Sequence, residues 1–420
     1  MGRIKSIKAR EILASGGAPS LEVSVELESG IIGEASVSYG ASVGSKEAVV
    51  LLDGGRRYEG RGMMMAVDMV NKIIGPRIVG MEAGEQQKLD EKMLQMDGTP
   101  NKSKLGGNSI LGVSMAVARA AANGVKLPLY KYLDKVYGLN SSFRLPKPMV
   151  VMIEGGKHAD QTTDLQEFCV SAKGTKTAVE NIRMEMEIYE ALKVILKREG
   201  LSTNGGNEGA FAPDQIASNE LPLDYLVEAI ESGGYKPNED AGISIDAAAS
   251  EFYELSSKYY VLSIEKKKLT SHELIEYYMN WVDEYPIVSM EDMLSEFDWE
   301  SWPILLTRIN GRFPLIADDL TVTNTKIWQE AIDKKAANAI LIKLNQAGTV
   351  SETIECCKLA IANKMWTIPS HRGGGETNDT FMADLAVAVG SEYIKVGPTR
   401  GERVCKYNRL MRIEEELSTK

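Results

Sequence analysis

Within the first 135 residues, the spacing of apolar residues changes from the alternation typical of strands to the spacing typical of helices. Over residues 4–40, apolar and polar residues alternate in short runs separated by turn residues, which predicts a hairpin or meander of β-strands. Over 63–74, apolar residues recur at helical spacing up to Gly75-Pro76, and 108–123 repeats this pattern, so two amphipathic helices are expected. We interpret residues 1–135 as a small α+β domain, with the run of three methionines that begins the first helix filling its core.

After the proline-containing stretch at 145–149, apolar strands alternate with helical segments, which is typical of parallel βα units. A charged or imidazole side chain stands at the carboxyl end of six predicted strands. These residues are Asp246, Glu291, Asp318, Lys343, His371 and Lys395. Because the carboxyl ends of barrel strands converge on one face, we expect the six to share one site.

Two α/β architectures bring strand ends together in this way. An open doubly wound sheet is the alternative to a barrel, but no G-x-G-x-x-G turn follows a first strand. The sequence therefore favours an α/β fold with a (β/α)8-like barrel over residues 142–420 and the α+β domain over residues 1–135.

Composition and charge narrow the class of protein. Of 420 residues, 44% are apolar and 25% charged, which argues against disorder. The 48 Lys+Arg and 59 Asp+Glu leave a net charge of −11, so neither nucleic acid nor a membrane is expected as a partner. Four scattered cysteines do not predict a disulfide framework or a zinc cluster. With no signal-peptide core and no run of membrane-spanning length, a cytoplasmic protein is expected.

Three of the strand-end acids suggest a metal site. Asp246, Glu291 and Asp318 offer oxygens from three strands, which suits a hard divalent cation with positions left open for water and substrate. The alternative is that these acids only pair with basic loop residues. Lys343 ends the neighbouring strand, and burial beside a cation would favour its neutral form, so that it could act as a general base. A lysine that merely forms an ion pair with the acids is the alternative there.

A base beside a metal points to removal of a weakly acidic proton alpha to a carboxylate, with the metal stabilising the resulting enolate. A second group must then assist the leaving group. Glu208 lies in the glycine-bounded segment GGNEGAFAP at 205–213, where a carboxyl group can approach a substrate closely. A glutamate in such a loop can equally be no more than solvated.

Longer motifs occur in order along nearly the whole chain. They include DGTPNKSKLGGNSILGVSMAVARAAA, GGKHAD, LQEF, NEGAFAP, SMED, ADDLTVTN, IKLNQAGTVSE, SHR, ETND and KYNRLMRIEEEL. In these motifs the chain resembles the enolase family, which interconverts 2-phosphoglycerate and phosphoenolpyruvate. The resemblance implies an enolase-type barrel with an N-terminal capping domain, and a lysine base acting with magnesium, an arrangement described for this superfamily.

The resemblance also implies a role for each matching residue. Lys343 would be the general base, Glu208 the general acid that helps to expel hydroxide, and Glu167 its support, with His371 beside them. The first magnesium would be bound by the three acids Asp246, Glu291 and Asp318. Substrate-binding positions are Lys395 at the carboxylate, Arg372 at the phosphate, and His158, Gly373 and Lys157 around the pocket.

Departures from the family pattern concentrate at the phosphate end and the second metal. They are Tyr39 for a metal-binding Ser, Asn207 for the Asp before the acid, Gly373, Gly374 and Gly375 with one extra residue for a phosphate-binding Ser, Lys157 for a Ser, Val396 for a Thr and Met293 for a Pro. A phenol does not replace a short hydroxyl, so weakened occupancy of a second magnesium site is expected. The loss of a charge at Asn207 should make Glu208 easier to ionise.

Three functions are compatible with this pattern. The first is a magnesium-dependent lyase that dehydrates 2-phosphoglycerate, which the intact pair of Lys343 and Glu208 favours. The second is an enolase-fold enzyme with an altered phosphate pocket for a related phospho- or phosphono-substrate, as in phosphonate natural-product biosynthesis, which Lys157 and the glycines favour. The third is a non-catalytic binding protein. A small phosphorylated carboxylate is the expected ligand, and the resemblance implies a homodimer or octamer.

Overall fold

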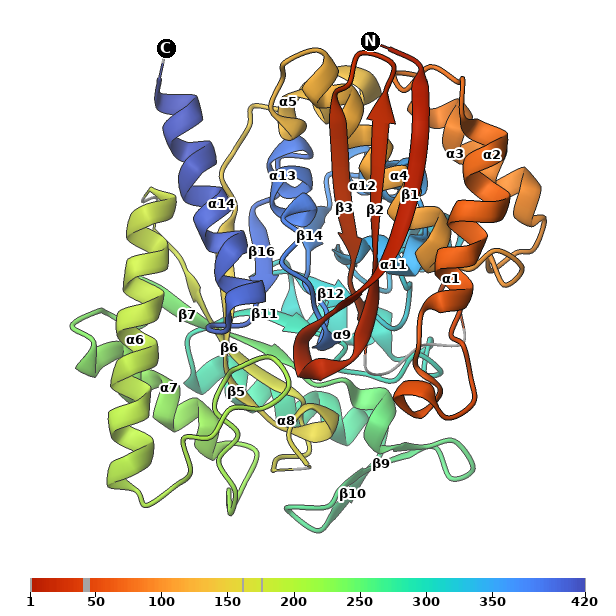
Figure 1. Cartoon of the computed structure of the whole chain (residues 1–420). Coiled ribbons are helices and arrows are strands. Elements are labelled where there is room, and N and C mark those ends of the chain that lie inside the picture. The colour runs from red at the N-terminus through yellow and green to blue at the C-terminus, as the bar shows by residue number, and fades with distance from the viewer. Residues whose placement is uncertain (1, 41–45, 161, 175–176, 420) are drawn as a thin grey trace.

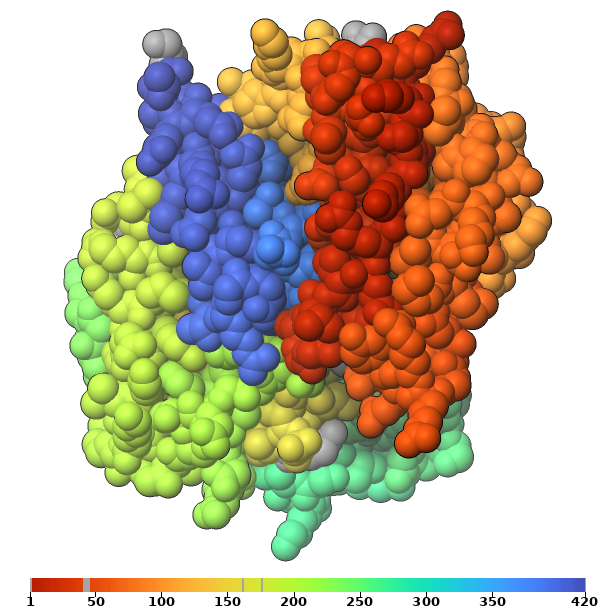
Figure 2. Space-filling model, in the orientation of Figure 1, coloured from red at the N-terminus to blue at the C-terminus, as the bar shows by residue number. Residues whose placement is uncertain are grey.

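The computed structural model describes residues 2–40, 46–160, 162–174 and 177–419. In Figure 1 the N-terminal part stands beside a barrel built from the rest of the chain, and both termini lie at the same end of the molecule. Hydrogen bonds of Ser15 with Gly374 and Glu376 join the N-terminal part to the C-terminal part of the chain, and Figure 2 shows the two parts, in red and blue, on the same face of the molecule. The N-terminal part therefore covers one side of the barrel.

The N-terminal part is a three-stranded sheet covered by helices. The strands β1 (Ile4–Leu13), β2 (Pro19–Leu27) and β3 (Ile32–Val37) pair antiparallel in chain order, which confirms the predicted meander. Helix α4 (Gly107–Gly124) packs so closely on β3 that a Cβ at Gly33 would lie 2.1 Å from the nitrogen of Ala120. The other elements are η1 (Ser15–Gly17), β4 (Tyr39–Gly40), η2 (Arg57–Gly60), α3 (Gln86–Asp97) and α5 (Leu129–Tyr137).

The first predicted helix differs from expectation in two ways. It does not end at Gly75-Pro76. Instead, α1 (Met64–Asp68) and the π-helical segment η3 (Met69–Ile74) continue directly into α2 (Gly75–Ile78). Proline is tolerated in the first turn of a helix, where its missing N–H breaks no bond. Only Met63 is buried, whereas Met64 and Met65 are exposed, so most of the methionine run does not fill the core.

An eight-stranded sheet forms the barrel, in the order β14-β13-β12-β11-β7-β6-β5-β16. Its strands are β5 (Lys147–Glu154), β6 (Glu167–Ala172), β7 (Ala241–Asp246), β11 (Ile287–Glu291), β12 (Leu315–Ala317), β13 (Ala339–Ile342), β14 (Trp366–Pro369) and β16 (Tyr393–Val396). A bridge between Ser370 and Lys395 joins the two ends of this order. The predicted barrel is thus confirmed.

One strand breaks the predicted parallel arrangement. Strand β6 is antiparallel to both of its neighbours, β5 and β7, so the expectation of parallel βα units throughout is wrong at this point. The short connection from β5 to β6 contains only η4 (Gly156–His158) and no crossover helix, and a parallel pair needs such a helix. As a result, the first residue of β6, Glu167, lies at the same rim as the last residues of the parallel strands.

Helices surround the barrel and connect its other strands. They are α6 (Ala178–Arg198), α7 (Leu221–Ser232), α8 (Ser271–Glu284), α9 (Trp302–Ile309), α10 (Thr325–Asp333), α11 (Leu344–Ala347), α12 (Val350–Ala362), α13 (Phe381–Ala388) and α14 (Gly401–Ser418). Short elements are η5 (Ala249–Phe252), the strands β8 (Tyr253–Glu254), β9 (Tyr259–Leu262) and β10 (Lys267–Leu269), and β15 (Gly374–Gly375). Among the described residues, no single helix is both long and apolar enough to cross a membrane; α4 and α5 meet that criterion only as a pair bent by 100°.

Candidate active site

A cavity of about 290 Å³ opens at the rim where the strands end. Of the predicted site residues, the following line it: Lys157, His158, Glu167, Glu208, Asp246, Asp318, Lys343, His371, Arg372, Gly373 and Lys395. Glu291 lies behind this wall and touches Lys395. The N-terminal part also contributes, through Gly40 and Glu47. Residues spread over most of the chain therefore meet in one polar cavity.

Strand register places three carboxylates side by side at the rim. Glu167 pairs with Asp246 across β6 and β7, and Asp246 pairs with Glu291 across β7 and β11. The ammonium of Lys395 lies 2.9 Å from Glu167, 2.8 Å from Asp246 and 2.9 Å from Glu291. Burial alone would lower the pKa of Lys395, but these carboxylates outweigh it and hold the pKa well above its usual range. The acids thus pair with a strand-end lysine rather than with basic loop residues.

The donor set at this rim suits a hard cation. Asp246, Glu291 and Asp318 present only carboxylate oxygens, and Oε1 of Glu291 is buried without a hydrogen-bond partner among the described residues. An oxygen left unpartnered in a buried place costs free energy unless an ion or water contacts it. Asp292, Asp318 and Asp319 also place ligand atoms within 4.8 Å of one another. These acidic residues could therefore hold a metal ion.

Lys343 directly follows β13, and its ammonium contacts Oδ2 of Asp318, which directly follows β12. The other carboxylate oxygen of Asp318 accepts a hydrogen bond of 3.1 Å from Gln346. Burial lowers the pKa of Lys343, but the charge of Asp318 outweighs it, so that the pKa lies above its ordinary value. The predicted lowering, which assumed a neighbouring cation, is therefore not produced by the protein groups alone.

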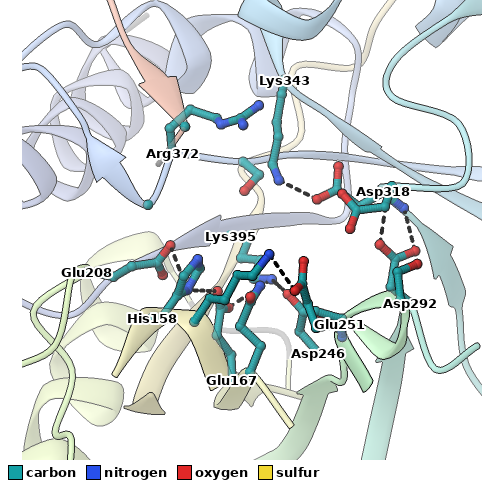
Figure 3. A pocket seen from close by; sticks show the side chains of 18 of the residues that line it. His158, Glu167, Glu208, Asp246, Glu251, Asp292, Asp318, Lys343, Arg372 and Lys395 are labelled. Carbon is teal, nitrogen blue, oxygen red and sulfur yellow. Dashed lines mark hydrogen bonds and ion pairs between the residues drawn. The ribbon is translucent and has the colours of Figure 1, made fainter. Parts of the chain in front are cut away.

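A second cluster surrounds Glu208 on another side of the cavity (Figure 3). Nδ1 of His158 lies 3.0 Å from Glu167 and 3.6 Å from Glu208, and Nε2 of His371 lies 2.9 Å from Glu208. These are ion-pair distances, but neither Nδ1 of His158 nor Nε2 of His371 makes a well-aligned hydrogen bond within the described chain. Both histidines line the cavity, and their buried nitrogens contact the carboxylates of the cluster.

In this cluster, burial and the neighbouring charged groups shift each pKa in opposite directions. Burial raises the pKa of Glu208, but His371 and His158 outweigh it and hold that pKa well below its usual range. Burial lowers the pKa of His158, but Glu208 and Glu167 raise it to about 9. A proton shared in this cluster therefore resides on His158 more readily than on Glu208. Perturbed pKa values of this kind are common at acid–base sites.

Arg372 and Gly373 line the part of the cavity where the chain departs from the family pattern. The Arg372 guanidinium lies 3.4 Å from Glu47 and 3.4 Å from Asn345. A Cβ at Gly373 would lie 2.7 Å from Oε1 of Glu208 and 3.0 Å from the ring of His158. A serine cannot occupy position 373 unless Glu208 or His158 moves, so at this position the chain presents only its backbone.

Tyr39 and the extra glycines pack against each other. Strand β15 pairs antiparallel with β4, which sets Gly375 opposite Tyr39, and a Cβ at Gly375 would lie 2.8 Å from the Tyr39 ring. The Tyr39 ring does not line the cavity, whereas its neighbour Gly40 does. The phenol therefore fills space behind the glycine strand. Residues 41–45 of the same loop, on which the second-metal prediction also depends, lie outside the described residues.

The remaining departures fall in three different surroundings. Lys157 lies half-exposed at the cavity rim, 2.5 Å from Glu251 on η5. The backbone carbonyl of Asn207 accepts a hydrogen bond of 3.2 Å from Arg403. Val396 and Met293 are buried in the apolar core and do not line the cavity.

Sequence reasoning missed several residues of the site. Glu154 is the last residue of β5, so the pattern of charged residues at strand ends could have identified it. Its carboxylate accepts hydrogen bonds from the backbone N–H groups of Glu208 and Ala210. Burial and the charge of Glu208 raise the pKa of Glu154 to about 8. Glu47 gave no local signal, because its loop reaches the cavity only through tertiary structure. Arg403 lies on a helix, far from any strand end, and is completely buried.

Comparison with protein families agrees with this fold. Residues 142–420 match the family model described as the enolase C-terminal TIM barrel domain. Residues 4–133 match the enolase N-terminal domain. Together the two matches cover nearly the whole chain and show that it belongs to the enolase family of lyases.

Proposed function

We propose that this protein abstracts the proton alpha to the carboxylate of 2-phosphoglycerate and eliminates water to give phosphoenolpyruvate. The observation that supports this most directly is that Lys343 and Glu208 reach one small cavity from different sides (Figure 3). An elimination needs a base at one carbon and an acid at the neighbouring leaving group, and these two residues supply both.

The chain's own residues divide the work. Neutral Lys343 takes the C2 proton, and the electron pair of that C–H bond moves onto the substrate carboxylate to give the enolate. This pair then forms the C2–C3 double bond as the C3–O bond breaks. The departing hydroxide takes a proton from the carboxyl of Glu208 and leaves as water. His158 holds a proton 3.6 Å from Glu208 and passes it to that carboxylate before the hydroxide leaves, because the histidines otherwise keep Glu208 ionised. Arg372 binds the phosphate, which suits the fork geometry of a guanidinium.

Asp246, Glu291 and Asp318 would hold magnesium at the substrate carboxylate, where its charge would stabilise the enolate. The proposal includes a second magnesium site of lower occupancy, since Tyr39 offers no short hydroxyl there.

The test is the absorbance of phosphoenolpyruvate formed from 2-phosphoglycerate by the purified, magnesium-loaded protein. A magnesium-dependent rate that disappears with a chelator supports the proposal. No rate above that of buffer would overturn it, provided that calorimetry shows that the protein binds magnesium.

Two observations favour a second candidate, an enzyme of the same fold acting on an altered phospho- or phosphono-substrate. Lys157 adds a cation at the rim, held by Glu251, and Gly373 leaves only backbone where the family pattern has a serine. If 2-phosphoglycerate gives no rate, binding of phosphonoacetate should be compared between the wild type and Lys157→Ser, with Lys326→Ser on an exposed helix face as control. Weaker binding in Lys157→Ser alone would favour this candidate, whereas equal binding would exclude a role for Lys157.

A further inference from the structure

Arg403 is a completely buried arginine next to the catalytic cluster, to which none of the roles above refers. It lies in the first turn of α14, and its side chain reaches the loop that carries His371 and Arg372. Nη1 lies 2.6 Å from Oε1 of Glu402, and Nη2 donates to the backbone carbonyls of Asn207, at 3.2 Å, and Arg372, at 3.3 Å. One guanidinium thus joins two loops of the site.

The third guanidinium nitrogen of Arg403, Nε, contacts the imidazole of His371. Nε of Arg403 donates to Nδ1 of His371 at 3.2 Å, and the backbone N–H of Gly397 donates to the same atom at 3.4 Å. Arginine has no acceptor and keeps its charge in proteins, so Nδ1 must be the acceptor in both contacts. An imidazole nitrogen that accepts a hydrogen bond carries no proton, and the proton of the neutral ring is then on the other nitrogen.

Nε2 is that other nitrogen, and it belongs to a residue that lines the cavity. It is buried, lies 2.9 Å from Oε2 of Glu208 and has no well-aligned hydrogen-bond partner among the described residues. We propose that Arg403 is a positioning residue that holds His371 as its Nε2–H tautomer and so directs a fixed N–H donor into the cavity beside Glu208. His371 then donates a hydrogen bond to the substrate, while His158 is the imidazole at Glu208 that stays free to gain and lose a proton.

The chain suits a direct measurement, because it has only three histidines. Protein labelled with ¹⁵N-histidine gives two-bond ¹H–¹⁵N spectra in which protonated and unprotonated ring nitrogens differ in shift. The variants His158→Gln and His272→Gln assign two of the rings and leave His371. The expected wild-type result at pH 7 is an unprotonated Nδ1 and a protonated Nε2 on His371. A protonated Nδ1, alone or in a doubly protonated ring, would overturn the proposal without any variant being needed.

A variant tests whether Arg403 is the cause. Arg403→Met keeps most of the apolar stem and removes the donors, so His371 should show a mixture of tautomers, while Arg412→Met, on an exposed position of the same helix, should leave the spectrum unchanged. An unchanged His371 spectrum in a folded Arg403→Met protein would contradict the role of Arg403.

The catalytic consequence rests on the proposed function, whereas the tautomer does not. With 2-phosphoglycerate, Arg403→Met should lower kcat by about tenfold or more with a smaller change in KM, as expected for a donor that matters most in the transition state. Arg403→Lys, which keeps a cationic donor, should recover part of kcat. If the wild type shows the expected tautomer but no turnover, the proposed function fails and the assignment of Arg403 stands.

Discussion

Lys343 and Asp318 form an ion pair at the ends of two neighbouring barrel strands, β13 and β12. The carboxylate keeps the lysine charged in this protein-only geometry, since it raises the pKa of Lys343 against the effect of burial. The base of the proposed reaction must be neutral, so that Asp318 must be engaged elsewhere when the base acts. Whether Lys343 is neutral therefore depends on whether Asp318 contacts it.

Lys343→Ala should abolish turnover with little effect on folding. Loss of a general base typically costs 10²–10⁴-fold, so we expect kcat to fall by about 10³-fold or more. The measurement is phosphoenolpyruvate formation together with circular dichroism. Lys326→Ala, at an exposed position, is the matched control. Near-normal activity in Lys343→Ala would remove it from the role of base.

Gly373→Ala should displace Glu208 or His158. The added Cβ would meet Oε1 of Glu208 at 2.7 Å, which is closer than atoms can approach without a shift. Because catalysis is sensitive to misplacement of about 1 Å, kcat/KM should fall by about tenfold or more. The control is Gly401→Ala, where a Cβ meets nothing within 4 Å. Equal activity of the two variants would show that Glu208 tolerates the contact.

Glu291→Gln should weaken magnesium binding while keeping the shape of the side chain. The substitution removes a buried carboxylate from the three-acid set, and we expect Kd for magnesium to rise by at least about tenfold. Isothermal titration of the metal-free protein with magnesium measures this change. Glu300→Gln, at an exposed position near the same strand, should behave as the wild type. An unchanged affinity in Glu291→Gln would place the metal elsewhere.

The metal-free protein should lose stability as the pH rises through the titration of His158. Folding raises the pKa of His158 from 6.5 to about 9, so its contribution is fully present below pH 6.5 and is lost as the pH approaches 9. At 1.36 kcal/mol per pKa unit, this contribution is at most about 3 kcal/mol. Urea unfolding at pH 6, 8 and 10 in chelator should show the free energy of unfolding falling more steeply in the wild type than in His158→Gln.

His272→Gln is the control for that experiment, since His272 is exposed on α8 and should leave the pH dependence unchanged. The same slope in the wild type and His158→Gln would mean that His158 keeps its ordinary pKa.

The expected oligomer, a homodimer or octamer, stays a prediction, and light scattering of the purified protein would test it.

Local patterns carried much of the fold. Alternation of apolar and polar residues predicted β1 to β3. The apolar runs of the barrel also ended where the strands end in the structure: β7 ends at Asp246, β11 ends at Glu291, and Asp318 directly follows β12. The reversal of β6 was missed, because period-two alternation and apolar runs contain no information on strand direction. The helix end at Gly75-Pro76 was misplaced, because proline in a first turn and proline that ends a helix have the same local sequence.

The sequence by itself determined which side chains stand at strand ends, since that depends only on local periodicity and on the rule that barrel strands end at one rim. Tertiary structure decided what those side chains contact. The contact of Lys395 with three carboxylates, the packing of Gly373 on Glu208 and the bond from Arg403 to His371 each join segments far apart in the chain. Charge pairing and hydrogen bonding act over a few ångströms of space, and no spacing along the sequence records that distance.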